Sequence, residues 1–201
     1  MAGEVEHAKG AAGARRAKEW LDATTRVNAQ YVVPNPIALP KLTFPWAGGT
    51  AGAFSFDLGG FLLGGDLQGE EFLAESKFYA SHGDQGTEYA KFVGKCYCAY
   101  KHRPERCDNF MWITWAPFLV TRWPELRTAR YVREQVLVHR ARTLATADEQ
   151  QAETLVDDEV LLAVANRLWI IVLSERQETL VISREHRGVI QAHEAQKGAG
   201  S

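Results

Sequence analysis

The sequence of 201 residues contains no long hydrophobic run and only three cysteines. No stretch approaches the roughly 18 consecutive apolar residues that a membrane-spanning helix needs, so we expect no membrane association. The N-terminal residues are polar and lack the apolar segment of a secretory signal. Cys96, Cys98 and Cys107 are therefore expected to be reduced thiols. These absences together predict a cytoplasmic protein.

The chain also lacks an internal repeat and any linker long enough to separate two domains. Its content of 46% apolar and 24% charged residues is ordinary for a globular protein. We therefore predict a single domain over residues 1–190. The remaining residues, 191–201, end in Gln-Lys-Gly-Ala-Gly-Ser and are expected to be a disordered tail.

Charge is unevenly distributed along the chain although the net charge is only −2. Residues 91–142 carry 11 Lys and Arg against 4 Asp and Glu, a net of +7, whereas the flanking segments are acidic. Such a basic block could contact a polyanion. The alternative is that these charges form solvated helix faces that are balanced by acidic neighbours.

The most informative stretch is Phe54 to Tyr79, where two apolar, aromatic-rich runs flank a glycine-rich polar centre. This pattern predicts a β-hairpin whose turn is centred on Asp66-Leu67. The second strand ends with Glu75 and Lys77, which lie on the same face because side chains alternate along a strand. A carboxylate and an ammonium on a largely apolar strand are costly unless they are paired or bind a metal.

The rest of the chain predicts helices and further strands around this hairpin. Apolar spacing and capping residues indicate helices near residues 11–28, 84–100, 124–145 and 146–166. Aromatic and β-branched content predicts strands at residues 109–116, 168–173 and 179–183. The order of elements favours an α/β (α+β) fold with a single mixed β-sheet flanked by helices.

The hairpin brings a second carboxylate to the Glu75–Lys77 pair. Antiparallel pairing about the predicted turn places Asp57 within one residue of both Glu75 and Lys77 across the ladder. Two carboxylates at that spacing repel each other unless a cation lies between them, and oxygen ligands suit Mg²⁺ or Mn²⁺. A lysine beside the metal can orient or deprotonate an attacking water, so these residues predict phosphodiester hydrolysis.

An Asp on the first strand of a hairpin, a Glu-x-Lys element on the second strand and a helix after it resemble the PD-(D/E)XK nuclease superfamily. The resemblance covers residues 11–117 and implies a restriction-endonuclease-like core, here with C-terminal helical and strand additions. It implies that Asp57 and Glu75 bind Mg²⁺ (or Mn²⁺) and that Lys77 assists catalysis. Gln85 and Tyr89 match a Gln-x-x-x-Tyr element similar to that of RecB-type nucleases.

Two positions depart from the pattern of that superfamily. Phe56 stands before Asp57 where a proline is common, and Ala14 stands where many members carry a supporting Glu on the first helix. Glu19 is the nearest acidic residue on that helix and is a candidate supporting residue. Asp66 is a rival for the first acidic role, but the hairpin places it at the tip, far from Glu75. These departures leave open a catalytically inactive nuclease-like fold that binds nucleic acid or protein.

The basic block supplies the candidate nucleic-acid contacts, because Arg and Lys suit phosphate binding. The residues chosen for this role are Lys91, Lys95, Arg103, Arg127 and Arg130. DNA is expected rather than RNA, and a homodimer or a protein partner could supply specificity. A second metal hypothesis is a zinc site made by the three cysteines with His102, but Cys96 and Cys98 diverge on a helix, which favours buried thiols.

Overall fold

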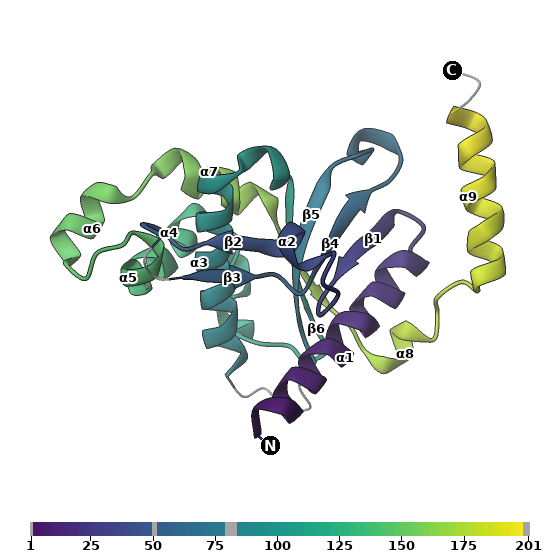
Figure 1. Cartoon of the computed structure of the whole chain (residues 1–201), viewed down its shortest axis with the longest axis horizontal. Helices are drawn as coiled ribbons and strands as arrows, with labels where there is room; N and C mark the ends of the chain where they lie inside the picture. Colours follow the sequence, from purple (N-terminus) through teal and green to yellow (C-terminus); the bar gives the residue numbers. More distant parts are fainter. Residues whose placement is uncertain (1, 50–51, 79–83, 199–201) are drawn as a thin grey trace.

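A computed structural model describes residues 2–49, 52–78 and 84–198 (Figure 1). The strands are β1 (Val27–Val32), β2 (Thr43–Pro45), β3 (Ala53–Ser55), β4 (Leu58–Leu62), β5 (Glu71–Lys77), β6 (Asn109–Thr114) and β7 (Leu168–Val172). The α-helices are α1 (Ala2–Ala23), α2 (Leu39–Leu42), α3 (Gln85–His102), α4 (Ala129–Val138), α5 (Arg140–Thr143), α6 (Glu149–Leu155), α7 (Asp158–Arg167), α8 (Glu175–Glu178) and α9 (Arg184–Gly198). Three short 3₁₀ turns are η1 (Gly65–Leu67), η2 (Pro104–Arg106) and η3 (Val120–Glu125).

Five strands form one mixed sheet in the order β1-β4-β5-β6-β7. The pairs β1–β4 and β4–β5 are antiparallel, whereas β5–β6 and β6–β7 are parallel. Helix α3 makes the crossover from β5 to β6, as a parallel pair requires. The predicted α/β (α+β) fold with a mixed sheet flanked by helices is therefore confirmed, although β2 and β3 form a second, two-stranded sheet.

The sheet lies between two layers of helices (Figure 1). Helix α1 covers one face, where Ala17 and Leu21 join a core cluster with residues of β4, β5 and β6. Helices α3, α4 and α7 cover the other face around Phe92, Phe110 and Trp112. Both faces of β6 are covered, and all six of its residues are buried, which accounts for its aromatic and β-branched sequence.

The first strand of the predicted hairpin is divided into β3 and β4. Strand β3 pairs with β2 in a separate two-stranded sheet, where Phe44 lies opposite Phe54. Phe56 is fully buried, with its ring 5.7 Å from that of Phe44 and 6.1 Å from that of Phe110. The chain therefore changes sheets at Phe56, and Asp57 is the residue that follows this change.

Two glycines allow the backbone of β4 to approach its neighbours closely. A Cβ added at Gly60 would lie 2.0 Å from the carbonyl oxygen of Asn28, and one at Gly59 would lie 2.9 Å from that of Phe72. The β1–β4 register shifts between Asn28 and Tyr31, next to this contact. Gly60 is thus required by the irregular edge pairing.

The C-terminal third differs from the prediction in three ways. The helix expected over residues 124–145 is divided into η3, α4 and α5, and that expected over 146–166 into α6 and α7. Thr128, Asp148 and Asp157 cap the new helix starts through their side-chain oxygens. The predicted strand over residues 179–183 is wrong: Ser174 forms a capping box that starts α8, and Leu180 beyond it is 81% exposed.

Helix α9 projects from the body at the end of the chain (Figure 1). Residues 191–198, where the sequence predicted a disordered tail, are helical as part of it. In residues 2–49, 52–78 and 84–198, no helix is long and apolar enough to cross a membrane.

Candidate functional site

Asp57 lies at the start of β4 and is fixed by β5 through its backbone and its side chain. Its N–H donates to the carbonyl oxygen of Ala74 at 2.9 Å, and its Oδ2 accepts from the N–H of Ser76 at 2.9 Å. The ladder ends with the pair Leu58 and Ala74, and Asp57, one residue before it, is bonded to Ala74 and Ser76, the residues on either side of Glu75. The turn, η1, occupies Gly65–Leu67, close to the centre expected from the sequence.

Glu75 is a buried carboxylate held between two lysines. Its residue exposure is only 5%. Lys77 Nζ lies 3.1 Å from Glu75 Oε1, and Lys95 Nζ lies 3.2 Å and 3.0 Å from Oε1 and Oε2. Lys95 also donates to the carbonyl oxygen of Ser55 at 3.2 Å. Two cations therefore compensate the charge of this buried carboxylate.

The pKa of Asp57 lies well above the ordinary value for an aspartate. Burial, followed by the negative charge of Glu75, raises the pKa of Asp57 from 3.8 to about 7, against the opposing effects of Lys77, the Ser76 N–H and Lys95. The Glu75 contribution shows that the two carboxylates act on each other electrostatically. A cation bound by both would remove this repulsion and favour the ionised form of Asp57.

A chain of alternating charges extends from the sheet to the first turn of α3. Lys77 Nζ lies 3.6 Å from Glu88 Oε2, and Lys91 Nζ lies 2.6 Å from Glu88 Oε1. Glu88 was not predicted from the sequence, and Lys95 was predicted only as a nucleic-acid contact. The available signal was their helical spacing from Gln85, since positions three or four residues apart share a helix face.

Gln85 lies beside Lys77 at the carboxyl ends of β5 and β6. The parallel register pairs Lys77 with Thr114, and the Thr114 hydroxyl donates to Gln85 Oε1 at 2.7 Å. Gln85 is fully buried, yet its Nε2 has no hydrogen-bond partner in the described part of the chain. This buried amide is thus a donor that a ligand or a water could satisfy.

The other two supporting candidates lie in different surroundings. Tyr89 is fully buried, and its hydroxyl donates to the carbonyl oxygen of Leu126 at 2.9 Å among the rings of Phe92, Trp112 and Phe118. Glu19 is exposed on α1. Ala14, where a supporting Glu would stand, is fully buried.

The acidic groups available for a metal are therefore Asp57 and Glu75. Within residues 2–49, 52–78 and 84–198, no group of three or more His, Cys, Asp and Glu is placed to hold a metal ion. Mg²⁺ is commonly bound by only one or two carboxylates together with water and substrate phosphate. The mutual repulsion of Asp57 and Glu75 fits such a partial ligand set.

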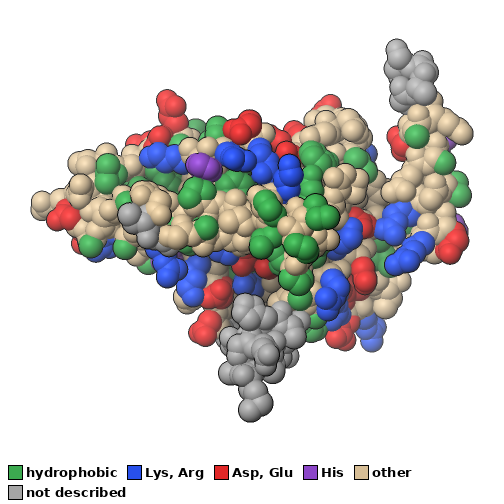
Figure 2. Space-filling model, viewed as in Figure 1, with side chains coloured by type: hydrophobic (Ala, Val, Ile, Leu, Met, Phe, Trp, Pro, Cys, Tyr) green, Lys and Arg blue, Asp and Glu red, His purple; other side chains and the backbone are tan. Residues whose placement is uncertain are grey.

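The predicted nucleic-acid contacts lie on several elements. Lys91, Lys95 and Arg130 pair with Glu88, Glu75 and Glu125, respectively. Arg103 is exposed at the end of α3, and Arg127 donates to the carbonyl oxygen of Leu168 at 3.5 Å. On the face drawn in Figure 2, basic side chains gather along one upper stretch, and elsewhere they alternate with acidic ones.

The three cysteines are buried free thiols. Burial raises the pKa of Cys98 and of Cys107 to about 12 and that of Cys96 as well, so all three are protonated at neutral pH. His102, the fourth residue of the zinc hypothesis, is exposed at the end of α3.

No family model, no curated protein and no solved structure matches this chain. Its function is therefore inferred from the geometry of the site alone.

Proposed function

We propose that this protein is a metal-dependent nuclease that hydrolyses phosphodiester bonds, with DNA as the substrate. The observation that carries the proposal is the convergence of Asp57, Glu75 and Lys77 across β4 and β5. Asp57 is hydrogen-bonded to Ala74 and Ser76, the two neighbours of Glu75 on β5, and Lys77 lies 3.1 Å from the Glu75 carboxylate. A buried carboxylate whose pKa is strongly shifted, as that of Asp57 is, is typical of catalytic sites.

Asp57 and Glu75 would hold Mg²⁺ or Mn²⁺, which supplies charge stabilisation and an activated water. Lys77 orients that water and offsets negative charge on the scissile phosphate. The Ser76 N–H fixes the orientation of Asp57 by donating to its Oδ2. Gln85 contributes a donor, Nε2, that has no hydrogen-bond partner in the described residues.

The order of elements around the site supports a restriction-endonuclease-like core. Helix α1 is followed by the antiparallel strands β1, β4 and β5, and then by α3 and the parallel strand β6. This is the order that the resemblance to the PD-(D/E)XK superfamily implies. Beyond β6, α4 to α9 and β7 would be additions to that core.

The test is cleavage of plasmid and linear DNA with Mg²⁺ or Mn²⁺. Glu75→Gln and Lys77→Met should each lower the rate by about 100-fold or more, because each removes a group that acts in the transition state. Asp66→Asn, which changes a carboxylate in the η1 turn, is the matched control and should cleave at the wild-type rate. Equal rates for all four proteins would exclude this function.

A second candidate is a nuclease-like module that binds without catalysis. It is favoured by Lys95, which contacts both oxygens of Glu75, and by the buried Ala14 on α1. A lysine there would replace the metal as the counter-charge. This module would bind DNA or a protein with no cleavage and without thermal stabilisation by Mg²⁺ or Mn²⁺.

A further inference from the structure

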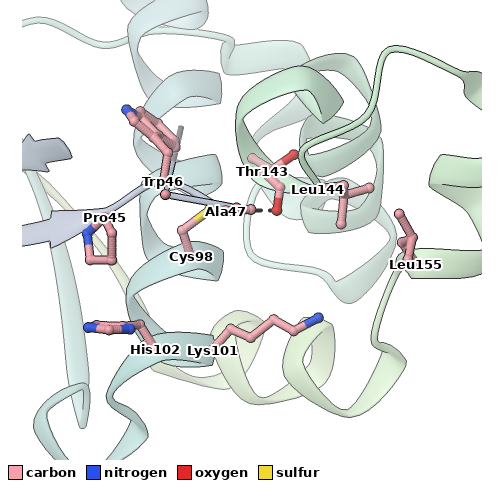
Figure 3. Close-up of a pocket in the computed structure, with 11 residues that line it drawn as sticks. Pro45, Trp46, Ala47, Cys98, Lys101, His102, Thr143, Leu144 and Leu155 are labelled. Carbon is pink, nitrogen blue, oxygen red and sulfur yellow. Dashed lines mark hydrogen bonds between the residues drawn. The ribbon is translucent and has the colours of Figure 1, made fainter. Parts of the chain in front are cut away.

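A cavity of about 450 Å³ lies at the opposite end of α3 from Gln85 (Figure 3). One wall is the segment from Pro45, the last residue of β2, to Gly49. The floor is Cys98 on α3, and the other wall is formed by Thr143, Leu144 and Leu155. The cavity thus lies where three parts of the chain, distant in sequence, meet.

The interior of this cavity is apolar and uncharged. Trp46 and Cys98 are 8% and 5% exposed, and Leu155 presents a side chain that is 41% exposed. The thiol of Cys98 donates to the carbonyl oxygen of Thr143 at 3.8 Å. Because burial raises the pKa of Cys98 to about 12, this group is neutral at physiological pH. The interior therefore favours an apolar group.

The mouth of the cavity carries positive charge. Lys101 and His102, both exposed, come from the last turn of α3 and diverge in Figure 3, His102 on the side of Pro45 and Lys101 on the side of Leu155. No carboxylate is among the described residues that line the cavity. Lys101 has no ion-pair partner in the described residues, where its Nζ lies 5.8 Å from the centre of the Tyr97 ring, whereas Lys91 and Lys95 on the same helix are paired with carboxylates.

A further cation lies over the cavity wall. The guanidinium of Arg142 is 5.7 Å from the centre of the Trp46 ring. Such a cation–π contact holds the guanidinium in place without neutralising its charge. The described surroundings of the cavity thus combine an apolar floor with cations at the rim.

We propose that this cavity binds a small amphiphilic anion, a single negatively charged group on an apolar body. The apolar body contacts Trp46, Cys98 and Leu155, and the negative group contacts Lys101. This inference does not rest on the proposed nuclease activity, because the cavity shares none of the residues Asp57, Glu75 and Lys77.

The test uses 8-anilinonaphthalene-1-sulfonate, an anionic probe that fluoresces in apolar surroundings, with the full-length protein. Decanoate should displace the probe at a concentration at least about tenfold lower than 1-decanol, since the two ligands share a chain and differ in charge. Equal displacement by the two ligands would overturn the proposal, because it would show that the cations play no part.

Two sets of variants locate the binding. Lys101→Ala should remove the preference for decanoate, whereas Lys41→Ala, the same change at an exposed position elsewhere, should leave it intact. Leu155→Asp should abolish displacement by decanoate, and Leu162→Asp, at a position that is 57% exposed and outside the cavity, should not. Identical displacement by variants and controls would place the probe elsewhere and refute the assignment.

Discussion

At the scale of single residues, the two positive charges beside Glu75, the proposed metal ligand, exceed the single negative charge of its carboxylate. Lys77 and Lys95 both contact it, and Lys95 reaches both carboxylate oxygens. A lysine that occupies both oxygens competes with a cation for the same charge. The affinity of the site for metal is therefore expected to depend on Lys95 as well as on the two acids.

Lys95→Met should raise the affinity for Mn²⁺ by about tenfold, because it removes the competing ammonium and preserves the apolar stem. Isothermal titration calorimetry measures this directly. Lys91→Met is the control, since Lys91 lies on the same helix but pairs with Glu88. Weaker Mn²⁺ binding by Lys95→Met would show that the ammonium supports the metal site.

The raised pKa of Asp57 should make the free energy of unfolding fall as the pH rises from about 4 to about 7. Its pKa is raised from 3.8 to about 7 in the folded protein, so folding binds a proton that the unfolded chain has released. The stabilisation is complete below about pH 4 and is lost as the pH rises to about 7. Because the asparagine in Asp57→Asn cannot ionise, this variant keeps the stabilisation at high pH and should be more stable than wild type at pH 8.

The advantage of Asp57→Asn should shrink as the pH falls and disappear near pH 4. Urea unfolding without divalent metal, at half-unit pH steps, measures the difference. Asp66→Asn should follow the wild-type curve, since Asp66 lies in the η1 turn. A constant difference between Asp57→Asn and wild type would show that Asp57 does not titrate in this range.

At the scale of elements, the hairpin is the part that sequence reasoning located well. The turn chemistry located its centre close to η1, but the predicted register placed Asp57 opposite Ser76 and differs by one residue from the observed pairing of Leu58 with Ala74. The change of sheet at Phe56 was not foreseen, because it depends on rings from β2, α3 and β6 that are distant in sequence. The same limit applies to Lys95, whose orientation depends on how α3 packs on the sheet.

The prediction at this scale concerns the edge pairing of β1. Gly60→Ala should destabilise the protein by about 2–3 kcal/mol, because the new methyl would lie 2.0 Å from the Asn28 carbonyl oxygen and force the strands apart. Thermal or urea unfolding measures the loss. Gly10→Ala, with nothing within 4 Å of the added Cβ, is the control and should be neutral or slightly stabilising.

At the scale of the whole molecule, fewer side chains of the basic block, residues 91–142, are available to bind a polyanion than the sequence implied. Arg122, Arg130 and Arg133 are bound to Glu125, Glu134, Glu153 and Asp158. Long-range pairing of this kind is not visible in a count of charges along the chain. The alternative of balanced helix faces therefore describes α4 better than a continuous polyanion surface does.

DNA binding should consequently show a modest salt dependence. We expect a slope of log K against log salt of about −3, which corresponds to roughly three or four phosphate contacts. Fluorescence anisotropy of labelled DNA between 50 and 200 mM salt measures this slope. Arg103→Ala should reduce the slope by about one, whereas Lys41→Ala should not. A slope near zero would remove the nucleic-acid partner from the proposed function.

The side chains of the candidate active site all come from residues 57–114, in which a short hairpin joins Asp57 to Glu75, and Gln85 and Glu88 lie within 11 residues of Lys77. Contacts between residues close in sequence need little loop closure and form early in folding. We therefore expect the geometry of the candidate active site to form before α4 to α9 pack. Substitutions beyond Thr114 should then raise the unfolding rate without changing the cleavage rate of each folded molecule.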